Sequence, residues 1–184
     1  AASFTPPVAV NAGDVVDAGA GTDTLALSLV GAANIGAFSN FDSFDAAGLN
    51  RTLDVDILSS KNTVTEFVAS GDVGAATLTN IGAGVGVRIT GDMAGSTLVA
   101  NQKTAGAITV TVDADETGTP DDGAEMVTGA VTTNATSVKA VFDTAYLADT
   151  TAEKALAMTA DNYTSLDLTA TAATSMEFVS GGAN

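Results

Sequence analysis

Two nine-residue units lie next to each other near the N-terminus of the chain. Asp14 and Asp23 occupy the same position of the period, and so do Val16 and Leu25. The second unit, A-G-A-G-T-D-T-L-A, follows the repeat G-G-x-G-x-D-x-U-x with Ala18 in the place of one glycine. In such a repeat a tight glycine turn precedes a short strand whose apolar residue points inward. The pattern therefore favours a protein built of coils stacked on one another.

The glycine turn of the second unit also predicts a calcium site. Gly19 and Gly21 let the backbone turn sharply, so that carbonyl groups and a carboxylate can point at one hard cation. Asp14, Asp17 and Asp23 supply carboxylates within and between the two units. Calcium sites in proteins are built from oxygen ligands of this kind. These five residues are the first candidate ligands.

The repeat stops after Leu25, which leaves the second half of the calcium site open. Eighteen residues beyond Asp23 the chain has Phe41, with Asp42 next to it and no glycine turn. We expect either that further repeats precede the chain or that Asp17 or Asp42 completes the ligand set. The alternative is an acidic surface turn that binds no ion.

A second acidic segment, residues 113–125, contains six carboxylates beside a glycine and a proline. Its opening matches an EF-hand loop, but the glutamate expected at position twelve comes one residue late and no amphipathic helices flank it. The segment predicts one of two structures. It is either an irregular calcium loop with Asp113, Asp115, Asp121 and Asp122 as ligands, or a solvated acidic loop between coils.

The composition limits the partners of the chain. Six Lys and Arg against 22 Asp and Glu give a formal net charge of −16, which disfavours binding to nucleic acid and to anionic membranes. The chain has neither Cys nor His, so disulfides, thiolate or imidazole metal ligands and the Ser-His-Asp triad are excluded. No apolar run approaches the roughly 20 residues of a membrane-spanning helix. Divalent cations are the natural counter-charge.

Short stretches of alternating apolar and polar residues recur along the chain and predict strands with one buried face. Three of them alternate, at 53–57, 85–89 and 108–112, and 40–45, 64–68 and 137–142 are further candidates. Small and β-branched residues dominate the apolar content, aromatic residues make up only 5%, and there is no Trp. This composition suits thin, closely stacked strands better than a thick globular core.

The C-terminal third repeats most plainly, in segments 155–160, 165–170 and 175–180. Leu156, Leu166 and Met176 fall ten residues apart, as do the apolar residues two positions later. We interpret each such column as apolar residues stacked directly from one coil to the next. The sequence therefore predicts an all-β, right-handed parallel β-helix or β-solenoid with short irregular coils, and the alternative is a β-sandwich.

Paired carboxylates such as Asp54 and Asp56 raise the question of a polysaccharide-cleaving enzyme. Both alternate with apolar residues, which predicts that they lie on the solvent face of a strand. Sugar clefts also need aromatic platforms and Arg, and the chain has two Tyr and only Arg51 and Arg88. We therefore expect no enzymatic activity.

The segment from about residue 10 to 50 resembles bacterial surface-layer proteins that carry RTX (repeat-in-toxin) segments. The likeness rests on the two glycine–aspartate units and on Phe38-Ser-Asn-Phe41-Asp-Ser-Phe44. In those proteins a glycine–aspartate turn precedes a "G-I-E-T-L"-like phrase and then Thr-rich strands, and Asn40-Phe41-Asp42-Ser43-Phe44 stands in that place here. A similar pattern of short strands rich in Thr, Ala and Gly recurs at 155–184. The resemblance implies RTX-like nonapeptide turns at 9–26 of a single β-solenoid segment, 1–184, that is part of a longer chain.

What the resemblance implies for function is a structural component of a surface layer. Such a protein is exported by a type I route, binds Ca²⁺ and assembles with its own copies into a lattice on the extracellular cell surface. Asp14 and Asp23 carry over as calcium ligands by their position in the motif, and a cell-surface polysaccharide is a further partner. The alternative is a segment of a large secreted RTX adhesin that binds surfaces or host ligands, because the motif is specific for calcium and not for function.

Overall fold

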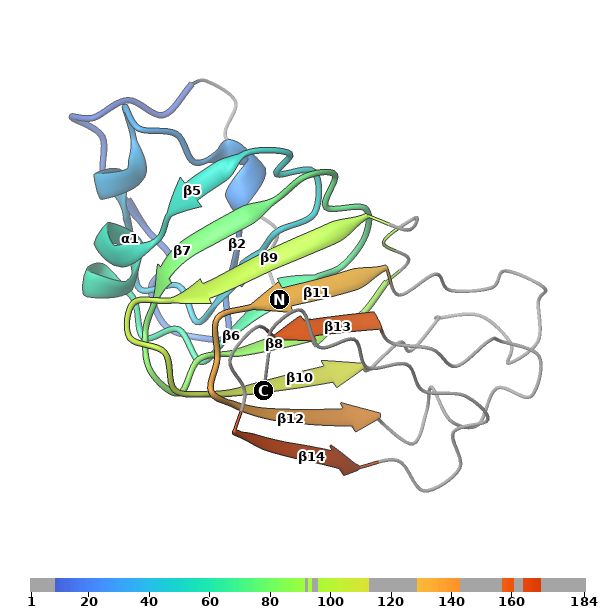
Figure 1. The fold of residues 1–184 in the computed structure, drawn as a ribbon. Helices are drawn as coiled ribbons and strands as arrows, with labels where there is room; N and C mark the ends of the chain where they lie inside the picture. Colours follow the sequence, from blue (N-terminus) through green and yellow to red (C-terminus); the bar gives the residue numbers. More distant parts are fainter. Residues whose placement is uncertain are drawn as a thin grey trace.

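The computed structural model describes residues 9–91, 93, 96–112, 129–142, 157–160 and 164–169. In these ranges the chain is all-β, with one α-helix and two short 3₁₀ helices. Every pair of neighbouring strands described is parallel. Two long sheets face each other across a common core (Figure 1).

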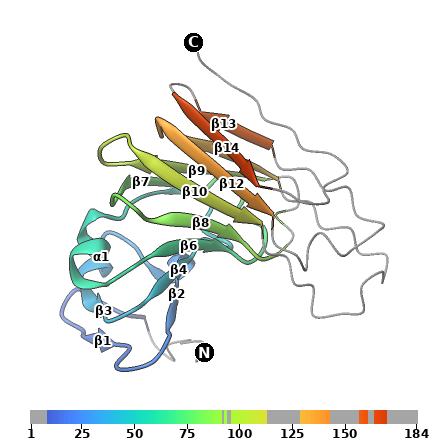
Figure 2. The same ribbon diagram turned by 90° about the horizontal axis from the view of Figure 1, so that it is seen from below.

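Within the described residues the larger sheet has seven strands, which lie next to one another in Figure 2. They are β2 (Thr24–Ala26), β4 (Ser43–Asp45), β6 (Glu66–Ala69), β8 (Gly86–Ile89), β10 (Ala107–Val112), β12 (Ser137–Phe142) and β14 (Ser165–Thr169). The second sheet has five strands. They are β5 (Thr52–Asp54), β7 (Thr77–Ile81), β9 (Thr97–Gln102), β11 (Ala130–Thr133) and β13 (Ala157–Ala160). A small third sheet pairs β1 (Val16–Asp17) with β3 (Phe38–Ser39).

The chain alternates between the two long sheets, which makes the fold a parallel β-solenoid and confirms the prediction. From β4 to β13 there are five complete coils, and each coil has one strand in the seven-stranded sheet and one in the five-stranded sheet. Equivalent residues of adjacent coils are 19 residues apart at Thr24 and Ser43 and 30 apart at Ala107 and Ser137. A β-sandwich, the predicted alternative, would pair its strands antiparallel.

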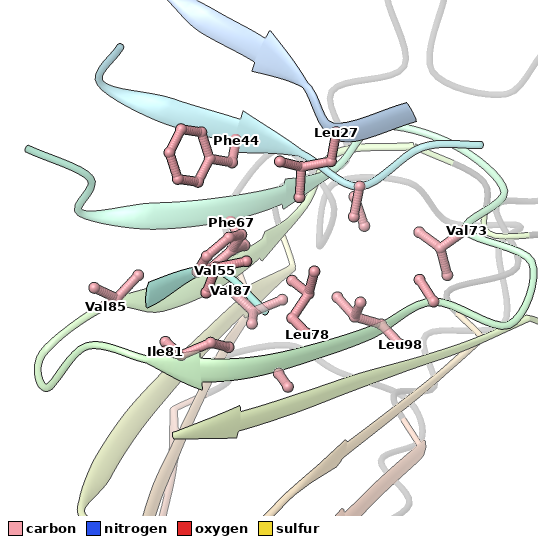
Figure 3. Packing of buried hydrophobic residues seen from close by; sticks show 14 of the residues in the cluster. Leu27, Phe44, Val55, Phe67, Val73, Leu78, Ile81, Val85, Val87 and Leu98 are labelled. Atoms are coloured by element: carbon pink, nitrogen blue, oxygen red, sulfur yellow. The ribbon is translucent and has the colours of Figure 1, made fainter. Parts of the chain in front are cut away.

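The core between the sheets consists of columns in which one side chain stacks on its equivalent in the next coil. In the seven-stranded sheet one column runs from Leu25 through Phe44, Phe67 and Val87 to Val110, all buried. The rings of the two phenylalanines lie 5.6 Å apart (Figure 3). Leu78 and Leu98 approach this column from the other sheet. The alternation seen in the sequence thus marks the inward positions of each strand.

Buried amides satisfy the backbone where coils turn. Asn62 accepts a hydrogen bond from the Phe41 amide at 2.8 Å and donates to the carbonyls of Leu58 at 2.7 Å and Phe38 at 3.3 Å. In a later coil, Gln102 and Asn134 exchange two backbone–side-chain bonds of 2.8 and 2.9 Å. Unpaired backbone groups in these corners would cost free energy, so the amides hold the turns in place.

The interpretation of the ten-residue columns is wrong. The segment 157–160 forms β13 in the five-stranded sheet, whereas 165–169 forms β14 in the seven-stranded sheet. The strand that stacks on β14 is β12, in which Val138 pairs with Leu166, 28 residues later in the chain. A spacing of ten therefore spans the two sides of one coil, because the chain crosses from one sheet to the other. The third segment, 175–180, lies outside the described residues.

The predicted strand at 53–57 is also shorter than expected. Strand β5 ends at Asp54, and helix α1 (Asp56–Lys61) begins two residues later. Oδ1 of Asp54 accepts the amide hydrogen of Asp56 at 3.0 Å, and a local bond of this kind turns the chain out of the strand. As a result Leu58 is buried, while Ile57 remains 50% exposed.

Candidate metal-binding junction between the first coils

Asp23 and Asp42 stand at equivalent positions of adjacent coils, each just before its strand in the seven-stranded sheet. The amide of Asp23 donates to Oδ2 of Asp42 at 2.9 Å. In return, the amides of Asp42 and Ser43 donate to the carbonyl of Asp23 at 2.9 and 3.2 Å. The hydroxyls of Thr24 and Ser43 lie 2.7 Å apart in the same step. These bonds fix the two aspartates at one junction between coils.

One oxygen at this junction has no partner among the residues that the structure describes. Oδ2 of Asp23 is buried and makes no hydrogen bond to any of them. A buried carboxylate oxygen without a donor or a cation costs free energy. Like charges in register on neighbouring strands also destabilise a sheet. A cation between Asp23 and Asp42 would remove both penalties.

The glycine turn before Asp23 has the geometry that the repeat predicts. Gly19 has φ of +81° and Gly21 has φ of +138°, a region that side-chain-bearing residues rarely adopt. A Cβ on Gly21 would lie 3.5 Å from Oδ2 of Asp23, so the turn passes close to the unpartnered oxygen. The turn and the aspartate therefore form one local unit.

Asp17 makes contacts that the sequence does not predict. Its Oδ1 accepts hydrogen bonds from Nδ2 of Asn40 at 2.7 Å and from the Gly19 amide at 2.9 Å. These two bonds, the one from Asn40 first, hold the pKa of Asp17 below its usual value. The side chain thus ties β1 to the turn of the next coil.

Asp14 is also placed apart from Asp23. It lies in an exposed turn, where its Oδ2 accepts the Asn11 amide at 2.8 Å. Although the two aspartates share a position of the nine-residue period, Asp14 precedes β1 of the small sheet and Asp23 precedes β2 of the large one. One period is half a coil, so the carboxylate that meets Asp23 comes from a full coil later.

The residues present fit calcium with part of a ligand set. Asp23 and Asp42 would hold the ion with two carboxylates, and the carbonyl groups of the glycine turn are further oxygen donors. Within 9–91, 93, 96–112, 129–142, 157–160 and 164–169, no three carboxylates gather into one group. Of the predicted ligands, the structure therefore places Asp23 and Gly21 at this junction, next to Asp42. Gly19 belongs to the same turn, and its amide donates to Asp17.

The remaining predicted ligands are not described. Asp113, Asp115, Asp121 and Asp122 all lie outside the described residues.

Asp42 was one of two residues that the sequence offered to complete the site, and the other, Asp17, bonds elsewhere. A clearer indication was present in the sequence: Asp42-Ser-Phe44 repeats the order aspartate, hydroxyl, apolar residue of Asp23-Thr-Leu25. The offset is 19 residues, one more than two repeats, because the coil contains an extra residue. A search with a strict period of nine residues therefore does not align Asp42 with Asp23.

The other carboxylates considered from the sequence have partners of their own. Asp54 lies on the exposed side of β5, where hydrogen bonds from the Asp56 amide and from Asn80 lower its pKa. A glycosidase acid needs the opposite shift. Asp56 forms an exposed ion pair with Lys103 at 2.8 Å.

Comparison of the chain with protein-family models, with curated proteins and with solved structures found no match. Among the helices of the described ranges, none has the length and hydropathy needed to span a membrane.

Proposed function

We propose that this chain is a structural segment of an extracellular surface layer, whose coils are ordered by calcium and whose copies assemble into a lattice. The observation that supports the calcium half is the buried, unpartnered Oδ2 of Asp23. It lies at a glycine turn and at a junction where Asp42 brings a second carboxylate. The resemblance of residues 10–50 to RTX-bearing surface-layer proteins supports the lattice half.

Calcium would act here as a counter-charge that joins two coils. An ion bound only by the folded chain stabilises it, by about 1.4 kcal/mol at a free concentration ten times its Kd. Two carboxylates and a few carbonyl groups form a weak site, and calcium modules outside cells work at about 10⁻⁴–10⁻³ M. The proposal therefore includes secretion to the cell surface, where calcium reaches that range.

The same ion would lower the barrier to assembly. At a net charge of −16, copies of the chain repel one another, and bound cations reduce that repulsion. Without calcium the copies remain apart. With calcium, contacts between neutral parts of the surface can hold them together.

Electron microscopy and sedimentation of the intact chain test this proposal, in millimolar calcium and in chelator. We expect sheets or large particles in calcium only, and far fewer for Asp23→Asn at the same calcium concentration. The control, Asp167→Asn, removes one negative charge from an exposed residue of β14 and should assemble like the original chain.

Two outcomes would overturn the proposal. A chain that stays monomeric at all calcium concentrations would contradict the lattice and favour a segment of an adhesin. Assembly that is equal in calcium and in chelator would contradict the role of the ion.

A further inference from the structure

The outer face of the five-stranded sheet differs from the rest of the molecule in its charge. Strands β7, β9, β11 and β13 contain no Asp, Glu, Lys or Arg at all. Their half-exposed or exposed outward residues, which we call the neutral face, are Thr77, Thr79, Thr97, Val99, Asn101, Ala130, Thr132 and Thr159. The first strand of the same sheet, β5, adds Asp54 at the edge of this face.

The seven-stranded sheet provides the contrast. Its strands carry five charged residues, at Asp45, Glu66, Arg88, Lys139 and Asp167. Some of these charges pair along the sheet, such as Arg88 with Glu66 at 2.9 Å. The chain thus keeps charge on one sheet and omits it from four consecutive strands of the other, although 15% of all its residues are charged.

The neutral face is also regular. Thr77 pairs with Val99, Val99 with Thr132, and Thr132 with Thr159, so one row of β-branched side chains crosses four coils. Adjacent strands of a sheet lie ~4.8 Å apart, which sets the spacing of the row. Rows of small β-branched side chains interdigitate well when two sheets stack face to face. Threonine adds a hydroxyl that can bond across such a contact.

We infer that the neutral face is the surface on which a second copy of this chain packs, an inference that rests on the assembly proposed above. Two chains of charge −16 repel least where neither presents a charge. The face also suits other partners poorly. It has no aromatic ring on which a sugar could stack, and no cation for an anionic lipid or polymer.

The size of the neutral face sets the strength of the contact. Four or five strands at ~4.8 Å, each of about five residues at ~3.3 Å, cover roughly 300–400 Å². A stable pair of proteins buries about 800 Å² on each partner. One such contact is therefore too small for a stable dimer, and because it joins copies only in pairs, a lattice also needs a second contact elsewhere on the chain.

Thiol cross-linking tests the inference without requiring a lattice, since the chain has no Cys of its own. Thr132→Cys places a thiol in the neutral face, and Thr109→Cys places one on the exposed side of β10 in the seven-stranded sheet. Stacked sheets lie ~10 Å apart, so a bifunctional maleimide of similar length spans the contact. At high protein concentration in millimolar calcium, we expect Thr132→Cys to cross-link about tenfold faster than Thr109→Cys, because the contact raises the local concentration of thiols.

A charge in the neutral face provides the second variant. Val99→Glu, combined with Thr132→Cys, should reduce the cross-linking rate to that of Thr109→Cys while leaving the circular dichroism spectrum unchanged. Equal rates for the two single variants, or a rate that Val99→Glu does not change, would overturn the inference.

The outcomes also separate this inference from the proposed function. If particles form in calcium but the two thiol variants cross-link at equal rates, the chain assembles into a lattice and the neutral face is not its contact. Fast cross-linking of Thr132→Cys without any particles would keep the contact between two copies and reject the lattice.

Discussion

Asn40 donates a 2.7 Å hydrogen bond from its Nδ2 to Oδ1 of Asp17, 23 residues earlier in the chain. Asn80 does the same to Oδ2 of Asp54, 26 residues earlier, at 2.8 Å. Both asparagines have a left-handed backbone, with φ of 62° and 60°. Asparagine tolerates this conformation better than most residues. The solenoid thus uses the same asparagine–aspartate clamp at two places.

The clamps predict how the fold responds to acid. The bond from Asn40, followed by that from the Gly19 amide, lowers the pKa of Asp17. A carboxylate with a lowered pKa stabilises the fold fully above its unfolded pKa of about 3.9, and this stabilisation is lost as the pH falls through the lower folded value. Asn40→Ala should therefore reduce the free energy of unfolding at pH 7 and flatten its fall below about pH 4. Urea unfolding from pH 7 to pH 2 measures both effects.

The matched control for this prediction is Asn101→Ala, which alters an asparagine on the outer side of β9. It should leave the slope of stability against pH unchanged. If the free energy of unfolding falls equally with pH below about pH 4 in Asn40→Ala and in Asn101→Ala, the clamp does not contribute to the pH dependence.

The buried amide of Asn62 predicts a large loss of stability. Asn62→Ala leaves the Phe41 amide and the carbonyls of Leu58 and Phe38 without their side-chain partner. Each unpaired buried group costs about 1–3 kcal/mol, and we expect a total of about 3 kcal/mol. Asn34 makes three similar bonds, but in a partly exposed turn where water can replace the side chain. Asn34→Ala should therefore cost about 1 kcal/mol.

Urea unfolding of both variants at pH 7 measures this difference. Equal losses for Asn62→Ala and Asn34→Ala would show that burial does not decide the strength of these bonds.

The sequence predicted the strands of this fold better than their stacking. Alternation identifies Val87, Ile89 and Val110 as inward residues, and all three are buried, because burial on one face of a strand imposes a period of two. It could not show which strands are neighbours, since a spacing of ten between Met158 and Leu168 is the same whether the segments stack or face each other. Register depends on the length of each whole coil, and that length varies along the chain.

The candidate site was predictable in part for the same reason. The glycine turn and Asp23 follow from a local pattern, and the left-handed glycines agree with it. The pairing of Asp23 with Asp42 depends on a coil of 19 residues. The sequence does not indicate strands β7, β9 and β11, because Thr, Ala and Asn fill their outward positions with little contrast to the inward ones.

Two glycines with a similar backbone conformation predict unequal costs of an added methyl group. Gly129 has φ of +64° and its Cβ would lie 2.3 Å from the carbonyl oxygen of Ser96, whereas Gly84 has φ of +81° and open space around it. Gly84→Ala should lower the free energy of unfolding only by the strain of its left-handed backbone, about 1–2 kcal/mol. Gly129→Ala should cost more than that, because two coils must also move apart.

Thermal unfolding of the two glycine variants provides the comparison. In a chain of this size 1 kcal/mol shifts Tm by about 2–4 °C. A Tm for Gly129→Ala at or above that of Gly84→Ala would contradict the close contact between Gly129 and Ser96.

The most direct test of the calcium junction is the Tm of the intact chain in millimolar calcium and in chelator, compared with that of Asp23→Asn. If calcium satisfies the buried Oδ2 of Asp23, the original chain and the control Asp167→Asn should gain about 1–6 °C in calcium, the shift expected from roughly 0.4–1.4 kcal/mol at a free concentration one to ten times the Kd. Asp23→Asn should gain less than half as much. A full gain in Asp23→Asn, or no gain in the original chain, would contradict a calcium ion between Asp23 and Asp42.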